Sequence, residues 1–457
     1  MLNFLDVYER CLKGPLMSEE DFTMNVLVPT VEQVVEAYGI TWDRDNPLPA
    51  DDGAADNIYH AALELLERVG LYCRNTNRVM QFTRAEILEA VREAPGRCVL
   101  GEGKDAAVYE VRKPDDPKWP YFTVGFGWIC SSEEMATNQM EAFASLAEAK
   151  AMKFPNLNHI RDIRIAAGSP MEIYASIRMI RIAREAMRRA GRPGMPIKSL
   201  LTTATSAATT LAASGPQFGL RPTDGWLAVI LPELSVDFEA LNKVAFLLNW
   251  GANIGATSAS TMGGYCGGPE GTAIVSTANV LAGLLVLKSN YQLGLPTDFK
   301  HGVQSSRAVL WVISSACQAV SRNIPVPVNW ISYMAAGVNT RMYFHEAAAT
   351  ILCCVTSGCA GLGTPHPAKG VKVDGATPLE ARFGIDMGKA ACKLSRSQAN
   401  EIVIKLLERY ESRIPTAPEG DRYQDCYDVR TGRPGDAYCK LYGDVKKELT
   451  AMGVPWV

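Results

Sequence analysis

Hydrophobic residues in the first part of the chain recur at helical spacing. Residues 56–70 place apolar side chains three and four positions apart, which is typical of one buried helix face. Residues 83–86 read Thr-Arg-Ala-Glu, a capping box in which the Thr hydroxyl and the Glu carboxylate bind free backbone N–H groups at a helix start. We therefore expect residues 1–120 to form an N-terminal helical cap that packs on the following domain.

From residue 121 onward, short apolar runs alternate with longer helical segments. The runs that predict strands are 121–126, 195–201, 226–231, 253–258 and 325–331. The helical segments between and after them begin at Ser169, Thr202, Asp237, Pro269, Ser305 and Thr340. Such strand–helix repeats require a parallel sheet that is covered on both faces. No dinucleotide-binding glycine pattern follows the first strand, so a closed (β/α)8 TIM barrel of the α/β class is favoured over a doubly wound sheet. We assign this barrel to residues 121–415.

Helical spacing returns near the end of the chain. Segments that start at Thr377 and Ser395, and a last one over 436–452, predict further helices. Residues 416–457 are expected to form a C-terminal helical extension that belongs to the same structural unit as the barrel.

Composition and charge exclude several classes of function. The 457 residues are 47% hydrophobic and carry a net charge of −3, so no basic surface for nucleic acid or an anionic membrane is expected. The N-terminus lacks the pattern of a signal peptide, and the apolar stretch 274–287 is interrupted by polar residues, as in a buried helix. Twelve cysteines without an export signal indicate reduced thiols and a cytoplasmic protein.

Several segments resemble the monomethylamine methyltransferases of methanogenic archaea. They are 71–73 (Leu-Tyr-Cys), 190–195 (Ala-Gly-Arg-Pro-Gly-Met), 263–265 (Gly-Gly-Tyr), 379–382 (Leu-Glu-Ala-Arg) and 423–429 (Tyr-Gln-Asp-Cys-Tyr-Asp-Val). They span nearly the whole chain in the same order. The resemblance implies a (β/α)8 barrel, a homo-oligomer, and transfer of a methyl group from an amine to the Co(I) of a corrinoid (cobalamin) held by a small partner protein. No tightly bound cofactor is therefore expected on this chain.

The resemblance also assigns candidate site residues. The family carries pyrrolysine, whose ring imine captures the amine, three positions after a Gly-Met pair, and Lys198 stands there. This residue is either genuine lysine or pyrrolysine written as its parent lysine. The family holds the amine with two glutamates, a glutamine and a tyrosine. Leu227 and Thr257 stand at the glutamate positions and Ile331 at the glutamine position, while Tyr333 matches. The loss of both carboxylates favours genuine lysine.

The departures from the family pattern suggest a different substrate. A neutral amine is a poor leaving group, so the nitrogen needs a positive charge, which a quaternary ammonium carries without any acid. Aromatic faces accept such a cation. With Tyr333, the tryptophans Trp128, Trp226 and Trp330 predict an aromatic cage for a quaternary amine such as a betaine; alternatively they pack beneath the cap. Lys198 then either pairs with a substrate carboxylate or is a structural lysine that reaches solvent.

Three other groups of residues are candidate parts of the site. His345 is a candidate polar contact at the barrel mouth, or else a helix histidine satisfied within the fold. The loop Gly263, Gly264 and Tyr265 either allows close approach of a partner's corrin ring or forms a simple tight turn. The cysteines at 353, 354 and 359, with His366, have unsuitable spacing for a compact zinc site, so no metal is expected.

These observations predict a methyltransferase that moves a methyl group from a methylated amine, with a quaternary amine among the candidates, to a corrinoid protein. A second hypothesis is monomethylamine specificity with pyrrolysine at Lys198. A third is an inactive paralogue that only binds a corrinoid partner; the lost carboxylates favour it, whereas three tryptophans near the strand ends argue against simple decay.

Overall fold

Eight parallel strands form the centre of the molecule, in a computed structural model that describes residues 2–200, 206–215 and 217–457. In sheet order they are β11 (Lys198–Leu200), β12 (Gly225–Ile230), β14 (Asn253–Ser258), β16 (Tyr291–Gly294), β18 (Val328–Trp330), β19 (Gly361–Gly363), β5 (Tyr121–Val124) and β7 (Ala151–Met152). A parallel bridge between Met152 and Ile197 joins the last strand to the first, so the sheet is closed. The predicted (β/α)8 barrel of the α/β class is confirmed.

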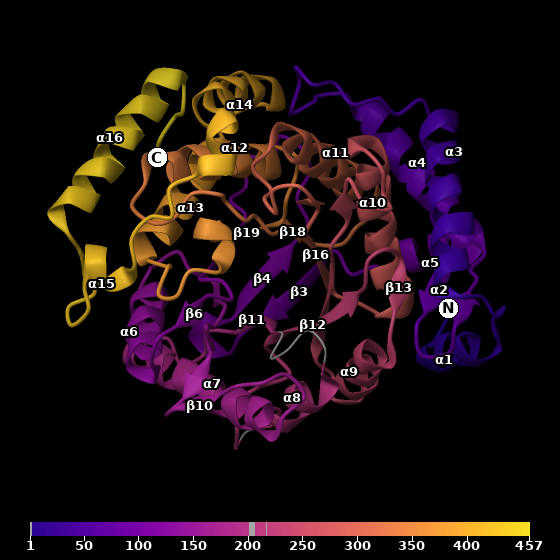
Figure 1. Ribbon diagram of the computed structural model, residues 1–457, viewed down its shortest axis with the longest axis horizontal. Helices are drawn as coiled ribbons and strands as arrows, with labels where there is room; N and C mark the ends of the chain where they lie inside the picture. The colour runs from indigo at the N-terminus through magenta and orange to yellow at the C-terminus, as the bar shows by residue number, and fades with distance from the viewer. Residues whose placement is uncertain (1, 201–205, 216) are drawn as a thin grey trace.

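A helix follows each barrel strand, and together these helices surround the sheet (Figure 1). They are α6 (Glu133–Ala144), α7 (Pro170–Arg189), α8 (Ala207–Ala212), α9 (Phe238–Asn249), α10 (Pro269–Val286), α11 (Arg307–Asn323), α12 (Arg341–Thr356) and α13 (Pro378–Ala391). Asp237 and Thr340 cap α9 and α12 through their side chains, and Thr377 forms a capping box on α13. The predicted start of the second helical segment, at Thr202, lies outside the described residues.

Helix α10 is apolar on all sides because it is buried on all sides. It is long and apolar enough to cross a membrane by length and composition alone, yet 89% of that stretch is buried within the fold. It packs between α11 of the ring and α4 (Asp52–Val69) of the N-terminal segment. Burial between protein elements therefore accounts for its composition.

The N-terminal helices lie against the outside of the ring. They are α1 (Phe4–Lys13), α2 (Glu19–Asp21), η1 (Phe22–Leu27), α3 (Val28–Ala37), α4 and α5 (Arg84–Arg92), where α5 begins with the predicted capping box. Strands β1 (Leu71–Cys73) and β2 (Arg78–Met80) form a small sheet with β13 (Ser235–Val236). Because α3, α4 and α5 all contact α10, these helices cover one flank of the barrel.

A hairpin that the sequence patterns did not predict plugs the amino-terminal end of the barrel. It consists of β3 (Arg97–Leu100) and β4 (Ala107–Glu110), with a short helix η2 (Gly103–Asp105) between them. Tyr109 of β4 is fully buried, and its ring centroid lies 5.0 Å from that of Tyr121 and 5.9 Å from that of Tyr291. Tyr121 and Tyr291 open strands β5 and β16, so this aromatic cluster forms the floor of the barrel interior.

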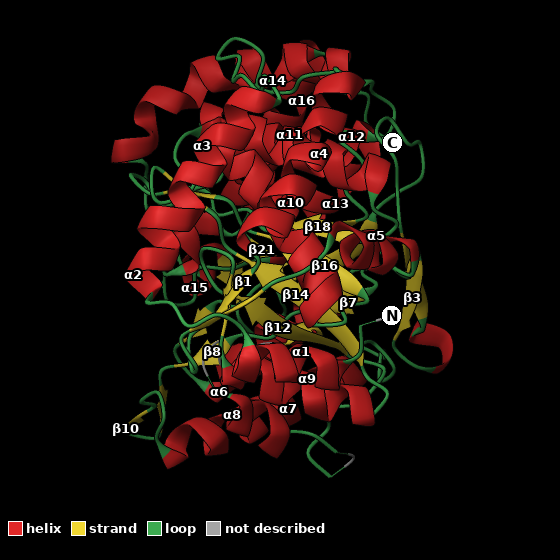
Figure 2. Ribbon diagram, turned by 90° about the vertical axis from the view of Figure 1, so that its right-hand side faces the viewer, coloured by secondary structure: helices red, strands yellow, loops and turns green. Residues whose placement is uncertain are grey.

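The C-terminal segment packs on the ring from the opposite side to the N-terminal helices (Figure 1). It comprises α14 (Arg396–Tyr410), η4 (Glu411–Thr416), α15 (Tyr423–Cys426), the hairpin β20 (Tyr427–Asp428) and β21 (Arg433–Pro434), and α16 (Asp436–Met452). Helices α14 and α16 both contact α12. In the side view of Figure 2 the barrel strands β12, β14, β16 and β18 lie between helices, whereas β3 and β10 lie at the edge of the molecule.

The remaining short elements lie in connections between these segments. They are the strands β6 (Ile129–Cys130), β8 (Asn156–Leu157), β9 (His159–Ile160), β10 (Ile163–Arg164), β15 (Thr261–Met262) and β17 (Thr297–Asp298), and the short helix η3 (Pro367–Gly370), which follows β19. The described residues contain no further strand or helix.

Removing the floor should destabilise the barrel, while removing one hydroxyl from it should not. Tyr109→Ala leaves a cavity at the closed end and is expected to cost about 3–5 kcal/mol, as for other large buried aromatic residues. Tyr109→Phe is the matched control, because the Tyr109 hydroxyl has no hydrogen-bond partner among the described residues. Its free energy of unfolding should change by less than about 1 kcal/mol. Urea unfolding of both variants measures this; equal losses would contradict the assignment of the ring as a packed plug.

Candidate functional site

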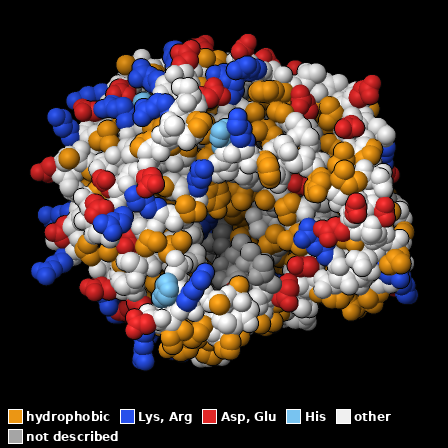
Figure 3. Space-filling view, in the orientation of Figure 1, with side chains coloured by type: hydrophobic (Ala, Val, Ile, Leu, Met, Phe, Trp, Pro, Cys, Tyr) orange, Lys and Arg blue, Asp and Glu red, His pale blue; other side chains and the backbone are white. Residues whose placement is uncertain are grey.

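A cavity of about 320 Å³ opens at the carboxyl ends of the barrel strands. Its lining consists of Gly127, Lys153, Phe154, Asn156, Leu227, Val229, Pro232, Thr257, Ser258, Ala259, Leu295, Ile331, Tyr333 and His366. In barrels of this architecture, ligands bind at this end because the strand-to-helix loops converge there. Figure 3, in the orientation of Figure 1, shows a hollow within the ring of helices with hydrophobic side chains along part of its edge.

Four of the predicted site positions meet in this cavity. Leu227 of β12, Thr257 of β14, and Ile331 and Tyr333 after β18 all line it. Strand alternation explains the convergence, since every second side chain of a barrel strand faces the interior. Burial raises the pKa of the Tyr333 phenol, so this residue is neutral at neutral pH.

The predicted aromatic cage is wrong. The Trp226 indole N–H donates to the Arg221 carbonyl at 3.0 Å, and the ring packs edge-on against Trp250 of the α9 end. The Trp128 indole N–H donates to Gln139 of α6 at 2.7 Å. Trp330 covers the outer face of Gly294, where an added Cβ would lie 2.2 Å from its ring. None of the three lines the cavity.

The physical reason is again strand alternation. Trp226 precedes the inward-facing Leu227, and Trp330 precedes the inward-facing Ile331. Adjacent residues of a strand point to opposite faces, so both tryptophans face the helices. The tryptophans therefore serve in packing, as the alternative interpretation of the sequence has it.

Lys198 faces the barrel interior but points toward its floor. Its Nζ lies 4.4 Å from the ring centroid of Tyr109 and 5.1 Å from that of Tyr291, and the side chain is fully buried. The Nζ has no hydrogen-bond partner among the described residues. Burial, aided by the charge of Lys153, lowers the pKa of Lys198 to about 7. Lys198 is not among the residues that line the cavity, so it does not reach solvent through the mouth.

A second buried lysine, which the sequence analysis missed, lies in the cavity wall. Lys153 follows β7, and its backbone N–H continues the pairing of that strand by donating to Val124. Its side chain is only 7% exposed, and burial lowers its pKa to about 8. Ala151 packs with the inward-facing residues Leu227 and Tyr291, so Lys153, two positions later, faces the interior as well.

His366 is the other missed residue of the cavity. Its ring stacks on Phe126 with centroids 4.5 Å apart and meets Tyr333 edge-on, also at 4.5 Å. Burial, together with the charge of Lys153, holds the pKa of His366 well below its usual value, so the ring is neutral. No Asp or Glu lines the cavity among the described residues, and the undescribed stretch 201–205 contains none in its sequence.

His345 does not reach the barrel mouth, so its predicted contact there is wrong. Its ring nitrogen lies 3.1 Å from the Glu448 carboxylate of α16, on the outer side of α12. Burial lowers the pKa of His345 to about 4, which leaves the ring neutral. The histidine thus joins α12 to the C-terminal extension, because its position on the helix turns it away from the strands.

The glycine loop lies beside the ends of β14 and β16. Gly263 has a φ of +85°, a conformation that favours glycine, and follows β15, which pairs with β17. Tyr265 is 54% exposed and Phe299, after β17, is 75% exposed. An added Cβ at Gly263 would lie 3.6 Å from the Phe299 side chain, so glycine leaves this apolar rim open.

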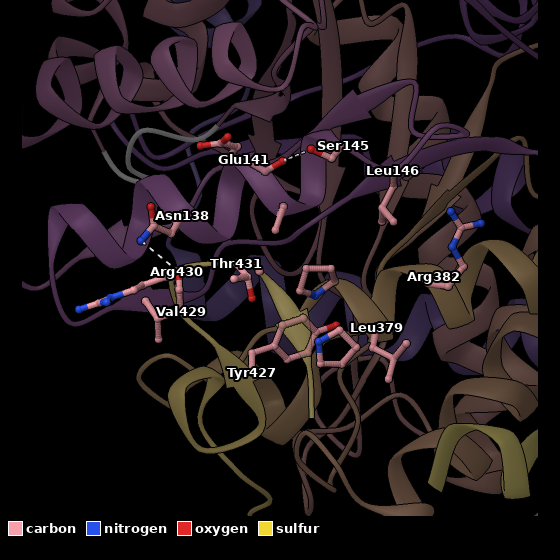
Figure 4. A pocket seen from close by; sticks show the side chains of 14 residues that line it. Asn138, Glu141, Ser145, Leu146, Leu379, Arg382, Tyr427, Val429, Arg430 and Thr431 are labelled. Atoms are coloured by element: carbon pink, nitrogen blue, oxygen red, sulfur yellow. Dashed lines mark hydrogen bonds between the residues drawn. The ribbon is translucent and has the colours of Figure 1, made fainter. Parts of the chain in front are cut away.

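A different groove of about 410 Å³ lies outside the ring, between α6, α13 and the hairpin of β20 and β21 (Figure 4). Leu379, Arg382, Tyr427 and Val429, which belong to two of the segments that resemble the family, line it. Arg382 is ion-paired with Glu148. Because no barrel strand end contributes to this groove, its residues join the C-terminal extension to the ring instead of forming the reaction cavity. Among the described residues, no group of three His, Cys, Asp or Glu side chains is arranged to hold a metal ion.

Comparisons with known proteins agree over the whole chain. The family model described as monomethylamine methyltransferase MtmB matches residues 2–454. Monomethylamine methyltransferase MtmB1 of Methanosarcina barkeri is 28% identical over 449 residues, which cover 98% of this chain and 97% of that protein. MtmB of Methanosarcina mazei is 27% identical with the same coverage. The crystal structure of the Methanosarcina barkeri enzyme, 27% identical, superposes with a TM-score of 0.94 over 99% of this chain and 98% of that one, as does a hydroxylamine complex of MtmB.

Replacing Lys198 by a neutral side chain should stabilise the protein at neutral pH. Folding lowers the pKa of Lys198 from 10.5 to about 7, so between these values the unfolded chain binds more protons than the folded one. The free energy of unfolding therefore rises with pH across this window. Lys198→Met should be more stable than the parent near pH 7 by a few kcal/mol, at ~1.4 kcal/mol per unit of pKa shift, with the difference shrinking toward pH 10. Urea unfolding of both proteins at several pH values measures it; a difference independent of pH would contradict the buried charge.

Proposed function

The chain belongs to the monomethylamine methyltransferase family and is a methyltransferase; on this premise we propose that it moves a methyl group from a methylated amine to the Co(I) of a corrinoid carried by a partner protein. The observation that carries the location is the cavity at the strand ends, in which Leu227, Thr257, Ile331 and Tyr333 meet. These are the positions that correspond to the amine-holding residues of the family.

The chemistry of the cavity favours an amine that is already quaternary. Methyl transfer needs nitrogen to leave with the C–N electron pair, which is easy from a cation and difficult from a neutral amine. No carboxylic acid lines the cavity among the described residues, and neutral His366 is packed between two rings. Since a quaternary ammonium leaves as a neutral tertiary amine without any proton transfer, it needs no acid from the protein.

The residues around the cavity would orient the methyl group and exclude water. Leu227, Val229, Leu295 and Ile331 give the cavity apolar walls against which methyl groups pack. The corrinoid supplies a strongly nucleophilic Co(I), whose electron pair forms the new Co–C bond. The exposed rings of Tyr265 and Phe299, beside Gly263 and Gly264, provide an apolar rim where a partner can dock its flat macrocycle. Most of the rate would then come from orientation and from a dry site.

A second candidate is monomethylamine specificity with pyrrolysine at position 198. The position is supported by the resemblance of residues 190–195, and the residue faces the barrel interior. Against it, Lys198 is enclosed by Tyr109, Tyr121 and Tyr291, and the carboxylates that would hold the small amine are absent. An inactive paralogue that binds a corrinoid partner without turnover is the third outcome that experiment can return.

Quaternary amines should be demethylated and monomethylamine should not. The protein is incubated with Co(I) cobalamin and a panel of methylated amines, and formation of methyl-cobalamin is followed by its absorbance. We expect turnover with at least one quaternary amine, and a loss of about 10-fold or more for Leu227→Glu, which places a charge in an apolar wall. Monomethylamine turnover alone would support the second candidate. Absence of turnover with every amine, for both cobalamin and the partner corrinoid protein, would support the third.

The mass of the peptide that contains residue 198 should equal the value for lysine. Because pyrrolysine carries a methylpyrroline carboxamide on the lysine Nζ, it adds a mass that intact-peptide spectrometry resolves directly. Protein purified from its natural source, not from a heterologous host that lacks pyrrolysine, is the sample to measure. A heavier peptide would overturn the assignment of genuine lysine.

A further inference from the structure

Two buried ammonium groups face the same barrel interior without a carboxylate. Lys153 is 7% exposed and Lys198 is fully buried, and the charge of Lys153 contributes to the lowered pKa of Lys198. The Lys198 Nζ has no hydrogen-bond partner among the described residues, and burial alone lowers the pKa of Lys153. An isolated buried cation is costly unless a partner compensates it, so the interior is arranged for a negative charge that the protein itself does not provide.

Two hydrogen-bond donors converge on a space in front of Gly363. An added Cβ at Gly363 would have Asn329 Nδ2 at 3.9 Å and Lys153 Nζ at 4.0 Å as its nearest neighbours. Thr123 of β5, paired in register with Gly363, adds a hydroxyl that has no partner among the described residues. A cationic donor and an amide thus lie about 4 Å from one point, with the Thr123 hydroxyl on the neighbouring strand, and such donors suit a carboxylate, which accepts several hydrogen bonds.

We propose that Lys153 and Asn329 form a carboxylate subsite, so that the substrate is a small zwitterion whose quaternary nitrogen lies a few bonds from its carboxylate. The inference rests on the proposed function and deepens it, because it names the substrate class of the same cavity. Lys153 lines the cavity together with Leu227, Leu295 and Ile331, so the carboxylate binds at the polar end and the methyl groups pack among the apolar walls.

Electrostatics then select the zwitterion over a bare cation. A tetraalkylammonium ion in this cavity faces the Lys153 ammonium directly, and the other titratable residues of the described lining, Tyr333 and His366, are neutral. In a zwitterion the carboxylate stands between the two positive charges and compensates both. Lys198, deeper in the barrel, adds a positive potential of the same sign, while its burial under Tyr109 keeps it from direct contact. This role replaces the pairing of Lys198 with a carboxylate that the sequence suggested.

The subsite is tested by binding, without any corrinoid. Isothermal titration of the full-length protein uses three probes: N,N,N-trimethylglycine, its uncharged-carbon analogue 3,3-dimethylbutanoate, and tetramethylammonium. The first two should bind, and tetramethylammonium should bind at least about 10-fold more weakly. Lys153→Met should weaken binding of both carboxylates about 10- to 100-fold, the range for a lost charge-assisted hydrogen bond. Acetate, included as a fourth probe, separates a general anion site from one that also needs the methyl-bearing end.

Lys150→Met is the matched control, because Lys150 lies three residues earlier on the same segment and is exposed outside the barrel. It should bind all probes as the parent does. If Lys153→Met does not fold, as judged by circular dichroism, Asn329→Leu carries the same prediction with a smaller loss. Equal affinity for tetramethylammonium and trimethylglycine, unchanged binding by a folded Lys153→Met, or no binding of either carboxylate would each overturn the subsite.

The cobalamin assay, run beside the titration, separates this proposal from the proposed function. Binding of trimethylglycine that depends on Lys153, without formation of methyl-cobalamin or methylated partner, leaves the subsite standing and removes the function. Turnover of tetramethylammonium and trimethylglycine at equal rates, unaffected by Lys153→Met, leaves the proposed function standing and removes the subsite.

Discussion

Closure of eight short parallel strands is the constraint on which the rest of the molecule depends. The bridge between Met152 and Ile197 completes the ring, and every second side chain of each strand must then share one narrow interior. The amino-terminal end of this interior is closed to solvent, because the hairpin that carries Tyr109 fills that end. Any ligand therefore enters from the carboxyl ends of the strands, and the loops there determine what it meets.

The same closure sorts the interior into layers of different chemistry. Tyr109, Tyr121 and Tyr291 form an aromatic floor, and Lys198 lies against their faces. Lys153, Asn329 and Thr123 provide a polar middle, and apolar side chains with Tyr333 and His366 surround the mouth. Aromatic rings partly compensate the Lys198 charge through their negative faces, which allows a buried lysine to persist where a carboxylate does not reach.

The architecture was predictable from the sequence, whereas the orientation of side chains was not. The hydrophobic periodicity of long helices and capping residues such as Asp237 and Thr340 predict the ring of helices. Apolar runs predict five of the barrel strands. Strands β7, β16 and β19 were missed because they are two to four residues long and lack alternating polarity. Lys153 and His366 follow two of these strands, so they were missed as cavity residues too. Trp226 and Trp330 lie away from the mouth for a different reason: each is adjacent in sequence to a residue at the mouth, and strand alternation turns adjacent side chains to opposite faces.

The absence of acids from the described cavity and the two buried lysines define one electrostatic environment. Two unit charges about 4 Å apart interact by ~4 kcal/mol at an effective dielectric constant of 20, enough to alter an affinity by several hundred-fold. No Asp or Glu among the described residues lines the cavity, and the Lys153 ammonium in its wall repels a cation. The zwitterionic substrate that we propose suits a cavity of this sign, because it brings its own anion. The proposed change of substrate accounts for a cavity without acids as economically as loss of activity does, and it also accounts for the buried Lys153 in the cavity wall.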